Sequence, residues 1–171
     1  MTASLTSTGS TAAVIVTHQR AELLRASLEQ VVHQTHPVQW VVVVDNGAED
    51  AVRELVKSMA GDRGVYVPSE TNLGGAGGFA LGFLTALSLG ADAVWCADDD
   101  GRPADHTVLA ELYRVAEGNR LHEVSPAVCN INDPGRLAFP LRQGLVWRRR
   151  MDELEGDFLP GIASLFNGAL I

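Results

Sequence analysis

Residues 39–47, QWVVVVDNG, decide the fold class of this chain. Their middle is apolar without alternation, which is typical of a β-strand that is covered on both faces. The run stops abruptly at Asp45, Asn46 and Gly47, residue types that favour a turn. Strands covered on both faces belong to parallel sheets with helices on either side. The stretch therefore predicts an α/β protein.

The segments around this strand repeat an alternation of strand and helix. Apolar runs predict strands over residues 12–16, 39–44, 64–67 and 91–97, and helical spacing of apolar residues predicts helices over 23–32, 51–59, 78–89 and 104–117. Such alternation favours an open, mostly parallel, Rossmann-like sheet with helices on both faces. Further short strands are expected at 124–131, 136–141, 144–149 and 162–171, so a β-rich extension follows the α/β half.

A length of 171 residues fits one domain or part of a larger one. We expect a flexible tail at 1–11, an α/β half at 12–103, and a helix followed by β-rich structure at 104–171. The last residues, SLFNGALI, have the pattern of a half-buried strand, and no polar tail follows them. We therefore expect the chain to be the front portion of a longer protein, truncated at its C-terminus.

Composition excludes several classes of protein. With 46 % hydrophobic and 20 % charged residues, the chain is able to form a sizeable core, which excludes global disorder. Its net charge of −8 repels a phosphate backbone, so no nucleic-acid partner is expected. Cys96 and Cys129 are too few for a disulfide framework and are expected to be reduced core thiols. No transmembrane run or signal peptide is recognised, so a cytoplasmic protein is expected.

Polar residues gather where the predicted strands end. They form four loops, at 17–20, 45–47, 72–78 and 98–100. The carboxyl ends of parallel strands meet at one edge of a sheet, and ligands of such sheets bind there. The four loops therefore predict one common site.

The triplet 98–100 follows the apolar strand AVWCA. On an extended segment alternate side chains point the same way, so Asp98 and Asp100 are predicted to project together. Two carboxylates on one side suit Mg²⁺ or Mn²⁺, with a diphosphate completing the coordination shell. The alternative is a solvated acidic turn. The sequence DDDG also resembles the nucleophile loop of haloacid-dehalogenase-like phosphatases, although that loop usually follows the first strand.

The stretch NLGGAGGF, residues 72–79, places four glycines directly before a helix. Glycines let the backbone approach a ligand closely, and the helix N-terminus favours negative charge. Its fit to G-x-G-x-x-A leaves an NAD-type dinucleotide-binding domain as an alternative. Asp45, at the end of its strand, either accepts a hydrogen bond from a base or ribose, or forms an Asx-turn before Gly47. Arg142 and residues 148–150 are the one basic concentration of the chain, usually a solvated face, but also suited to a diphosphate or an anionic lipid.

Taken together, VIVTHQR, VVVVDNG, NLGGAGGF and the DDD triplet resemble the GT-A nucleotide-sugar transferases of glycosyltransferase family 2. The stretches WCADDDG, EVSPAVCNINDP, RLAFPLRQGLVWRRR and LPGIASLFNGAL are similar to the actinobacterial galactofuranosyltransferases that begin the galactan of the mycobacterial cell wall. The resemblance covers nearly the whole chain from residue 13 to residue 170. It implies a GT-A fold whose nucleotide-binding half is 12–103 and whose acceptor-side half starts at 104.

The resemblance also implies a reaction and its partners. The donor would be UDP-galactofuranose, and the acceptor a polyprenyl-diphosphate-linked rhamnosyl-GlcNAc of arabinogalactan synthesis at the inner face of the cell membrane, with peripheral membrane contact. The divalent metal, Mn²⁺ or Mg²⁺, would assist an inverting transfer.

Residue roles are carried over from the family motifs. Metal ligation is implied for Asp98 and Asp100, and contact with the UDP-sugar for Thr17, Arg20, Asp45, Asn72, Gly74 and Asp98. The role of Asp99 is the least defined of the triplet. The family places its catalytic base and a histidine metal ligand on later segments, so no catalytic base is expected before residue 171, and the fragment alone is expected to transfer nothing.

Overall fold

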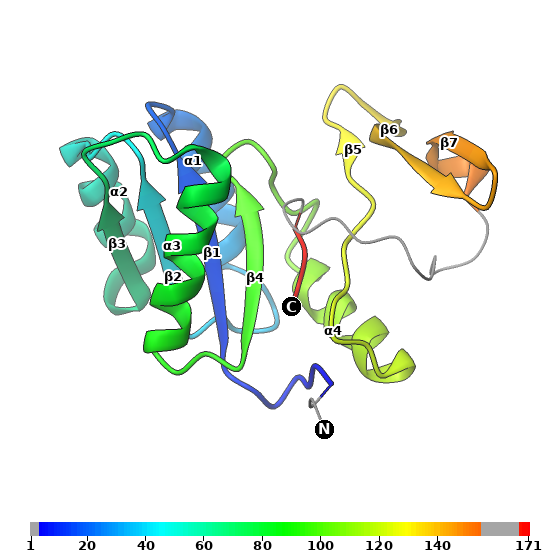
Figure 1. The fold of residues 1–171 in the computed structure, drawn as a ribbon, viewed down its shortest axis with the longest axis horizontal. Helices are drawn as coiled ribbons and strands as arrows, with labels where there is room; N and C mark the ends of the chain where they lie inside the picture. Colours follow the sequence, from blue (N-terminus) through cyan, green and yellow to red (C-terminus); the bar gives the residue numbers. More distant parts are fainter. Residues whose placement is uncertain (1–3, 155–167) are drawn as a thin grey trace.

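The computed structural model describes residues 4–154 and 168–171. Its central sheet has four parallel strands in the order β3-β2-β1-β4 (Figure 1). These strands are β1 (Thr11–Thr17), β2 (Trp40–Asp45), β3 (Gly64–Pro68) and β4 (Ala93–Asp98). The parallel α/β sheet predicted from the sequence is confirmed.

Helices cover both faces of this sheet. They are α1 (Ala21–Val32), α2 (Asp50–Ala60), α3 (Gly74–Ser88) and α4 (Val108–Asn119), with a short 3₁₀ helix η1 (Gly61–Arg63) after α2. Figure 1 shows α3 on one face and α1 with α2 on the other. The helices therefore enclose the sheet as the uninterrupted apolar strands predict.

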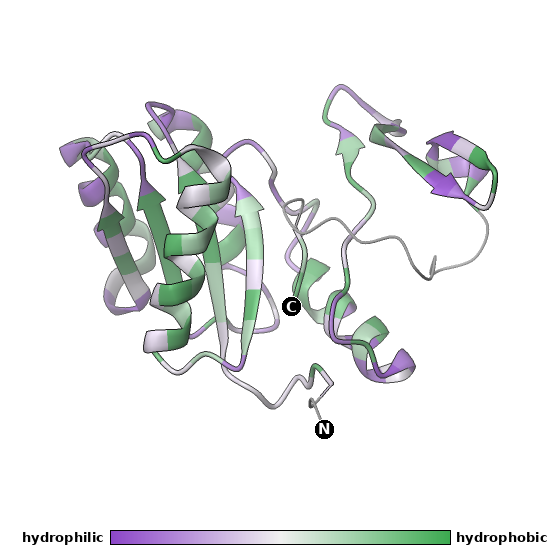
Figure 2. Ribbon diagram, in the orientation of Figure 1, coloured by the Kyte–Doolittle hydropathy of each residue, from purple (hydrophilic) through white to green (hydrophobic). Residues whose placement is uncertain are grey.

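The valines of β2 show why the strand has no polar alternation. Val41 and Val43 belong to the hydrophobic cluster built with α1, α2 and α4. Val42 and Val44 belong to the other cluster, with Phe79 of α3. All four valines are fully buried, and the sheet strands are correspondingly hydrophobic in Figure 2. Burying both faces of one strand stabilises the layered fold through the hydrophobic effect.

Two helices begin four residues away from their predicted starts. The third helix starts at Gly74 rather than Gly78, so the glycine stretch is helical and not a loop. The fourth starts at Val108 rather than residue 104, because Asp105 Oδ1 accepts hydrogen bonds from the amide and the hydroxyl of Thr107, at 2.7 Å each. A local side-chain bond of this kind competes with helix formation and delays the start of the helix.

A second, antiparallel sheet follows α4, and Figure 1 shows it standing apart from the central sheet. It consists of β5 (Cys129–Asn130), β6 (Asp133–Gln143) and β7 (Val146–Arg150), followed by the 3₁₀ helix η2 (Met151–Glu153). The β-rich extension is thus present, although β5 is much shorter than predicted. Cys96 is a buried free thiol, whereas Cys129 lies half-buried in β5, so the prediction of a core position is wrong for Cys129.

The last four residues return to the central sheet. The backbones of Val94 and Ile171 exchange hydrogen bonds of 2.8 and 2.9 Å, and Leu170 forms antiparallel bridges to Trp95 and Val124. This segment therefore continues the sheet beyond β4 in the antiparallel direction. Residues 162–167 of the predicted strand, and residues 1–3 of the predicted tail, lie outside the described part of the chain.

Candidate functional site

The carboxyl ends of β1, β2 and β4 and the start of α3 border an open cavity of about 350 Å³. Its lining residues are Val16, Thr17, His18, Arg20, Asn46, Asn72, Gly74, Gly75 and Asp98. Residues from all four predicted loops are therefore brought together. Asp45, Asp99 and Asp100 are not among the lining residues.

The acidic triplet leaves the extended conformation after its first member. Strand β4 ends at Asp98, and Asp99 and Asp100 form a turn. Alternation along a strand therefore does not apply, and the premise that placed Asp98 and Asp100 on one side is wrong. Asp98 is half-buried, Asp99 is buried and Asp100 is exposed.

Two residues of the first loop hold this turn. The hydroxyl of Thr17 donates to Asp99 Oδ2 over 2.8 Å. The guanidinium of Arg20 lies 2.9 Å from Asp99 Oδ1 and 3.0 Å from Asp100 Oδ2. Burial nevertheless raises the pKa of Asp99, although the Thr17 hydrogen bond and Arg20 oppose that rise. Thr17 and Arg20 thus line the cavity, while their polar groups bind the acidic turn, and their contact with a UDP-sugar stays a prediction.

Asp98 is the carboxylate that lines the cavity. Its burial, followed by the nearby carboxylates of Asp100 and Asp99, raises its pKa to about 6, and Arg20 offsets only part of this. Such a shift marks a site where negative charge is costly and where a cation is favoured. Among the described residues, no group of three or more His, Cys, Asp or Glu side chains is arranged to hold a metal ion. A metal ion bound at Asp98 would therefore need further ligands besides the His, Cys, Asp and Glu side chains of the described residues.

Asp45 is engaged in the turn that follows β2. Its Oδ1 accepts the amide of Gly47 at 2.9 Å, and its Oδ2 accepts the amide of Glu49 at 2.7 Å and the hydroxyl of Tyr66 at 2.9 Å. The side chain is fully buried. Burial, and then the hydrogen bond to Asp45, raise the pKa of Tyr66 to about 12, so the phenol stays a donor. The structure thus contains the Asx-turn alternative, and ligand contact by Asp45 stays a prediction.

Asn46 is a buried residue that the sequence reasoning did not single out. Its Oδ1 accepts the amide of Leu73 and its Nδ2 donates to the carbonyl of Gly74, both at 3.3 Å. Its own carbonyl lies 3.2 Å from Nδ1 of His18. Asn46 therefore ties the first loop and the start of α3 to β2. An amide side chain at the end of a buried strand was the available signal.

The start of α3 forms one wall of the cavity. Asn72 Oδ1 accepts the amide of Gly74 at 2.8 Å, and Gly74 has a φ of +67°, a backbone conformation that favours glycine. Both Gly74 and Gly75 line the cavity. A helix N-terminus attracts anions through its amide groups and its dipole. The arrangement thus pairs a site for negative ligand groups with the Asp98 carboxylate.

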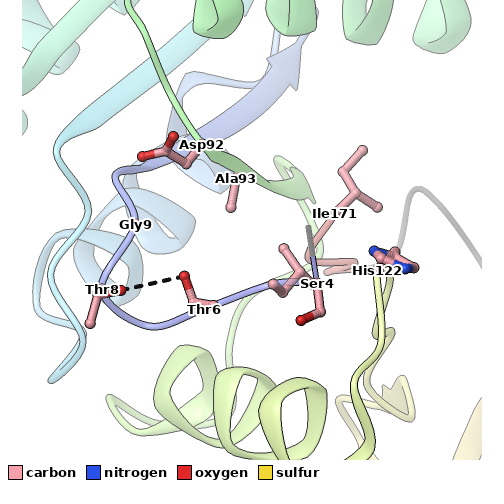
Figure 3. A pocket seen from close by; sticks show the side chains of 9 residues that line it. Ser4, Thr6, Thr8, Gly9, Asp92, Ala93, His122 and Ile171 are labelled. Carbon is pink, nitrogen blue, oxygen red and sulfur yellow. Dashed lines mark hydrogen bonds between the residues drawn. The ribbon is translucent and has the colours of Figure 1, made fainter. Parts of the chain in front are cut away.

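A second cavity, of about 420 Å³, lies at the opposite end of the central sheet, beside the amino end of β4 (Figure 3). It is lined by Ser4, Leu5, Thr6, Thr8, Gly9, Asp92, Ala93, His122 and Ile171. The Asp92 carboxylate in its wall already accepts hydrogen bonds from the amide and hydroxyl of Ser10, at 2.8 and 2.7 Å. Although this cavity is larger, it lacks the convergence of strand ends and helix N-terminus found at Asp98.

The described helices include none that is both long enough and apolar enough to cross a membrane.

The chain is similar to a galactofuranosyltransferase, GlfT1, of Mycolicibacterium smegmatis, with 57 % identity over 97 % of its own residues. It spans 57 % of the length of that protein. The GlfT1 of Mycobacterium tuberculosis H37Rv is also 57 % identical, over 95 % of this chain and 55 % of that protein.

A similar fold occurs in a mannosyltransferase from Pyrobaculum calidifontis, whose structure holds GDP-Man and Mn²⁺. The TM-score is 0.58 at 22 % identity, covering 77 % of this chain and 39 % of that one. The model of glycosyl transferase family 2 matches residues 12–168, nearly the whole chain. On the strength of that match and of the mycobacterial relatives, the chain belongs to glycosyl transferase family 2.

Proposed function

We propose that the chain forms the donor-binding part of a metal-dependent, inverting galactofuranosyltransferase that uses UDP-galactofuranose. Membership of glycosyl transferase family 2 and two relatives named as galactofuranosyltransferases support this assignment. The observation that carries it is local: Asp98 lines the same cavity as Gly74 and Gly75 of α3. One carboxylate beside one helix N-terminus suits a metal–diphosphate group better than either component alone.

The residues fit a divalent metal that is shared with the ligand. Mg²⁺ commonly binds proteins through one or two carboxylates and takes its remaining ligands from water and substrate phosphates. We assign Asp98 as the first carboxylate. Asp100 is proposed as the second, and because it lies outside the cavity lining and is paired with Arg20, it would have to leave Arg20 and turn towards the metal. Bound there, Mn²⁺ or Mg²⁺ would neutralise charge on the departing UDP. The Mn²⁺ named with the similar mannosyltransferase supports the choice of a hard divalent ion.

The other lining residues would hold the nucleotide. Asn72 and Gly74 present polar groups of the glycine stretch, and Thr17 and Arg20 form the wall next to the acidic turn. For Asp45 we propose contact with the uracil or ribose only if a ligand rearranges its three hydrogen bonds. Its first role is to shape the loop that carries Asn46.

The acceptor in this proposal is a polyprenyl-diphosphate-linked rhamnosyl-GlcNAc of arabinogalactan synthesis at the inner face of the cell membrane. Its hydroxyl would lose its proton to a carboxylate base, and its oxygen would attack the anomeric carbon of galactofuranose. The bond between that carbon and the diphosphate would break, and UDP would leave. None of the residues in 4–154 and 168–171 is assigned as that base. The proposed contribution of these residues is to bind the donor and to orient the diphosphate.

Calorimetric titration tests the donor assignment directly. UDP is expected to bind in the presence of Mn²⁺ and to bind far more weakly without it, and Asp98→Asn is expected to remove the dependence on Mn²⁺. Asp62→Asn makes the same charge change at an exposed position of η1 and should leave binding unaltered. Metal-independent binding of NAD would instead support the dinucleotide-binding alternative, and UDP binding that ignores both Mn²⁺ and Asp98→Asn would overturn the metal-linked proposal.

A further inference from the structure

The hairpin of β6 and β7 carries an unusual concentration of positive charge. Residues 136–150 contain five of the 13 Lys and Arg residues of the chain and no Asp or Glu, although the whole chain has a net charge of −8. None of these arginines lines the Asp98 cavity. The basic stretch therefore requires an explanation separate from donor binding.

Strand register divides the outer half of the hairpin into two faces. Arg142 lies opposite Trp147, and Leu141 lies opposite Arg148. Because side chains alternate along a strand, Arg149 shares the face of Arg142 and Trp147. All three of these residues are exposed, with Trp147 at 58 %, and we call them the Trp147 face.

The opposite face is engaged within the hairpin. Arg148 is half-buried, and its Nε donates to Gln143 Oε1 over 3.1 Å. Leu141 and Gln143 are likewise half-buried. All three residues of the Trp147 face are exposed, whereas on the opposite face only Val146 and Arg150 are, so the Trp147 face is the more open of the two.

The turn places an aliphatic side chain at the tip of the hairpin. Leu145 is 91 % exposed, and Gly144, with a φ of +62°, allows the tight two-residue turn that carries it outward. Val146 is 51 % exposed, but it lies opposite Gln143 and so belongs to the other face of the hairpin. Figure 2 shows hydrophobic and hydrophilic residues side by side along this hairpin. Leaving such aliphatic groups in water is costly, so an apolar tip beside arginines indicates a partner with both apolar and anionic layers.

We propose that the Trp147 face and the Leu145 turn form a docking surface for an anionic lipid bilayer. Trp is preferred at the boundary between lipid headgroups and acyl chains, and Arg places its charge among anionic headgroups while its methylenes stay in the apolar layer. The positive hairpin complements a negative membrane, whereas the acidic remainder of the chain is repelled by it. A nucleic acid offers negative charge but no apolar layer for Leu145.

Sedimentation with vesicles tests the docking surface in the full chain. Binding is expected to vesicles of phosphatidylcholine mixed with phosphatidylglycerol, to weaken at higher salt, and to be nearly absent with phosphatidylcholine alone. The pair Arg142→Gln and Arg149→Gln should weaken partitioning about 30-fold, at roughly 1 kcal/mol for each charge near the surface. The matched pair Arg53→Gln and Arg114→Gln, on α2 and α4, should leave it unchanged.

The aliphatic tip needs its own test. Leu145→Ser should weaken vesicle binding while far-UV circular dichroism shows the fold unchanged, because this side chain is almost fully exposed. A fluorescence blue shift on binding should disappear in Trp147→Phe. Equal losses in both arginine pairs, equal binding to neutral vesicles, or hairpin-dependent self-association without vesicle binding would overturn the proposal. UDP titration of the same variants separates this outcome from failure of the donor site.

Discussion

Gly82 lies where α3 crosses β1, and replacing it with alanine is expected to destabilise the chain. A Cβ atom at this position would lie 2.3 Å from Cγ1 of Val14 and 3.4 Å from Cγ2 of Val44. Val14 is fully buried in the middle of the central sheet, with β2 on one side and β4 on the other. The new methyl group therefore has no free space, and its neighbour has little room to move.

The size of the effect follows from the missing space. A distance of 2.3 Å is about 1.1 Å short of the 3.4 Å at which ordinary contact begins, so α3 and the sheet must separate. Overpacking of a core costs about 1–3 kcal/mol, and this displacement belongs at the upper end of that range. The better helix propensity of alanine returns about 1 kcal/mol. The expected net loss is about 2 kcal/mol, which lowers the Tm by roughly 4–8 °C.

Urea unfolding followed by circular dichroism measures this loss. The matched control is Gly118→Ala in α4, an exposed helical glycine whose added Cβ meets nothing within 4 Å. The control should be neutral or stabilising by up to about 1 kcal/mol. If Gly82→Ala is as stable as the wild type while Gly118→Ala behaves as expected, the close approach of α3 to β1 is not a structural requirement.

Three further substitutions probe the contacts around the site and the chain start. Asn46→Ala removes two hydrogen bonds to the start of α3 and should cost about 1–3 kcal/mol in urea unfolding, with faster amide exchange there. Arg20→Gln removes the cation from the buried acidic turn and should cost about 1–2 kcal/mol, less than a fully buried pair because the guanidinium is half exposed. Hydrogen bonds from Ser10 lower the pKa of Asp92, so this carboxylate stabilises the fold above its unfolded pKa and loses that contribution as the pH falls through its folded pKa. Asp92→Asn should therefore flatten the acid side of a stability–pH curve, and Asp62→Asn should not.

Much of the fold follows from local pattern. The four valines of β2 predict a strand buried on both faces, and the structure places two of them in each hydrophobic cluster. The turn residues after each strand likewise mark the edge at which the site forms. These features depend on periodicity and turn chemistry within a few residues, so one sequence is enough to recognise them.

The glycine stretch shows where local pattern fails. Glycine disfavours helix, so residues 74–77 were expected to be a loop. In the structure, added Cβ atoms at Gly78 and Gly82 would collide with Val16 and Val14, so these glycines let α3 approach β1 closely. Gly74 and Gly75 have no such neighbour, but Asn46 accepts the amide of Leu73 and donates to the carbonyl of Gly74. The earlier start of the helix thus accompanies a contact with a distant loop, which a local pattern does not contain.

The acidic triplet fails for a related reason. The prediction treated residues 98–100 as extended, but Asp99 turns inward to Thr17 and Arg20, more than 75 residues earlier in the chain. Contacts between distant segments decide the conformation of the turn, and a strand-alternation rule has no access to them. The common edge of the four loops was predictable, whereas the role of each carboxylate was not.

Electrostatics links the metal and the nucleotide in the proposed function. The cavity contains Asp98, whose neighbours Asp99 and Asp100 add negative charge that Arg20 only partly offsets. A diphosphate entering alone meets the α3 N-terminus, which attracts it, and these carboxylates, which repel it. A divalent cation reverses the second interaction, so it should increase the affinity for UDP, and UDP must then increase the affinity for the cation by the same factor. In the proposed function, the charge of the cavity therefore favours binding of UDP together with a hard divalent ion.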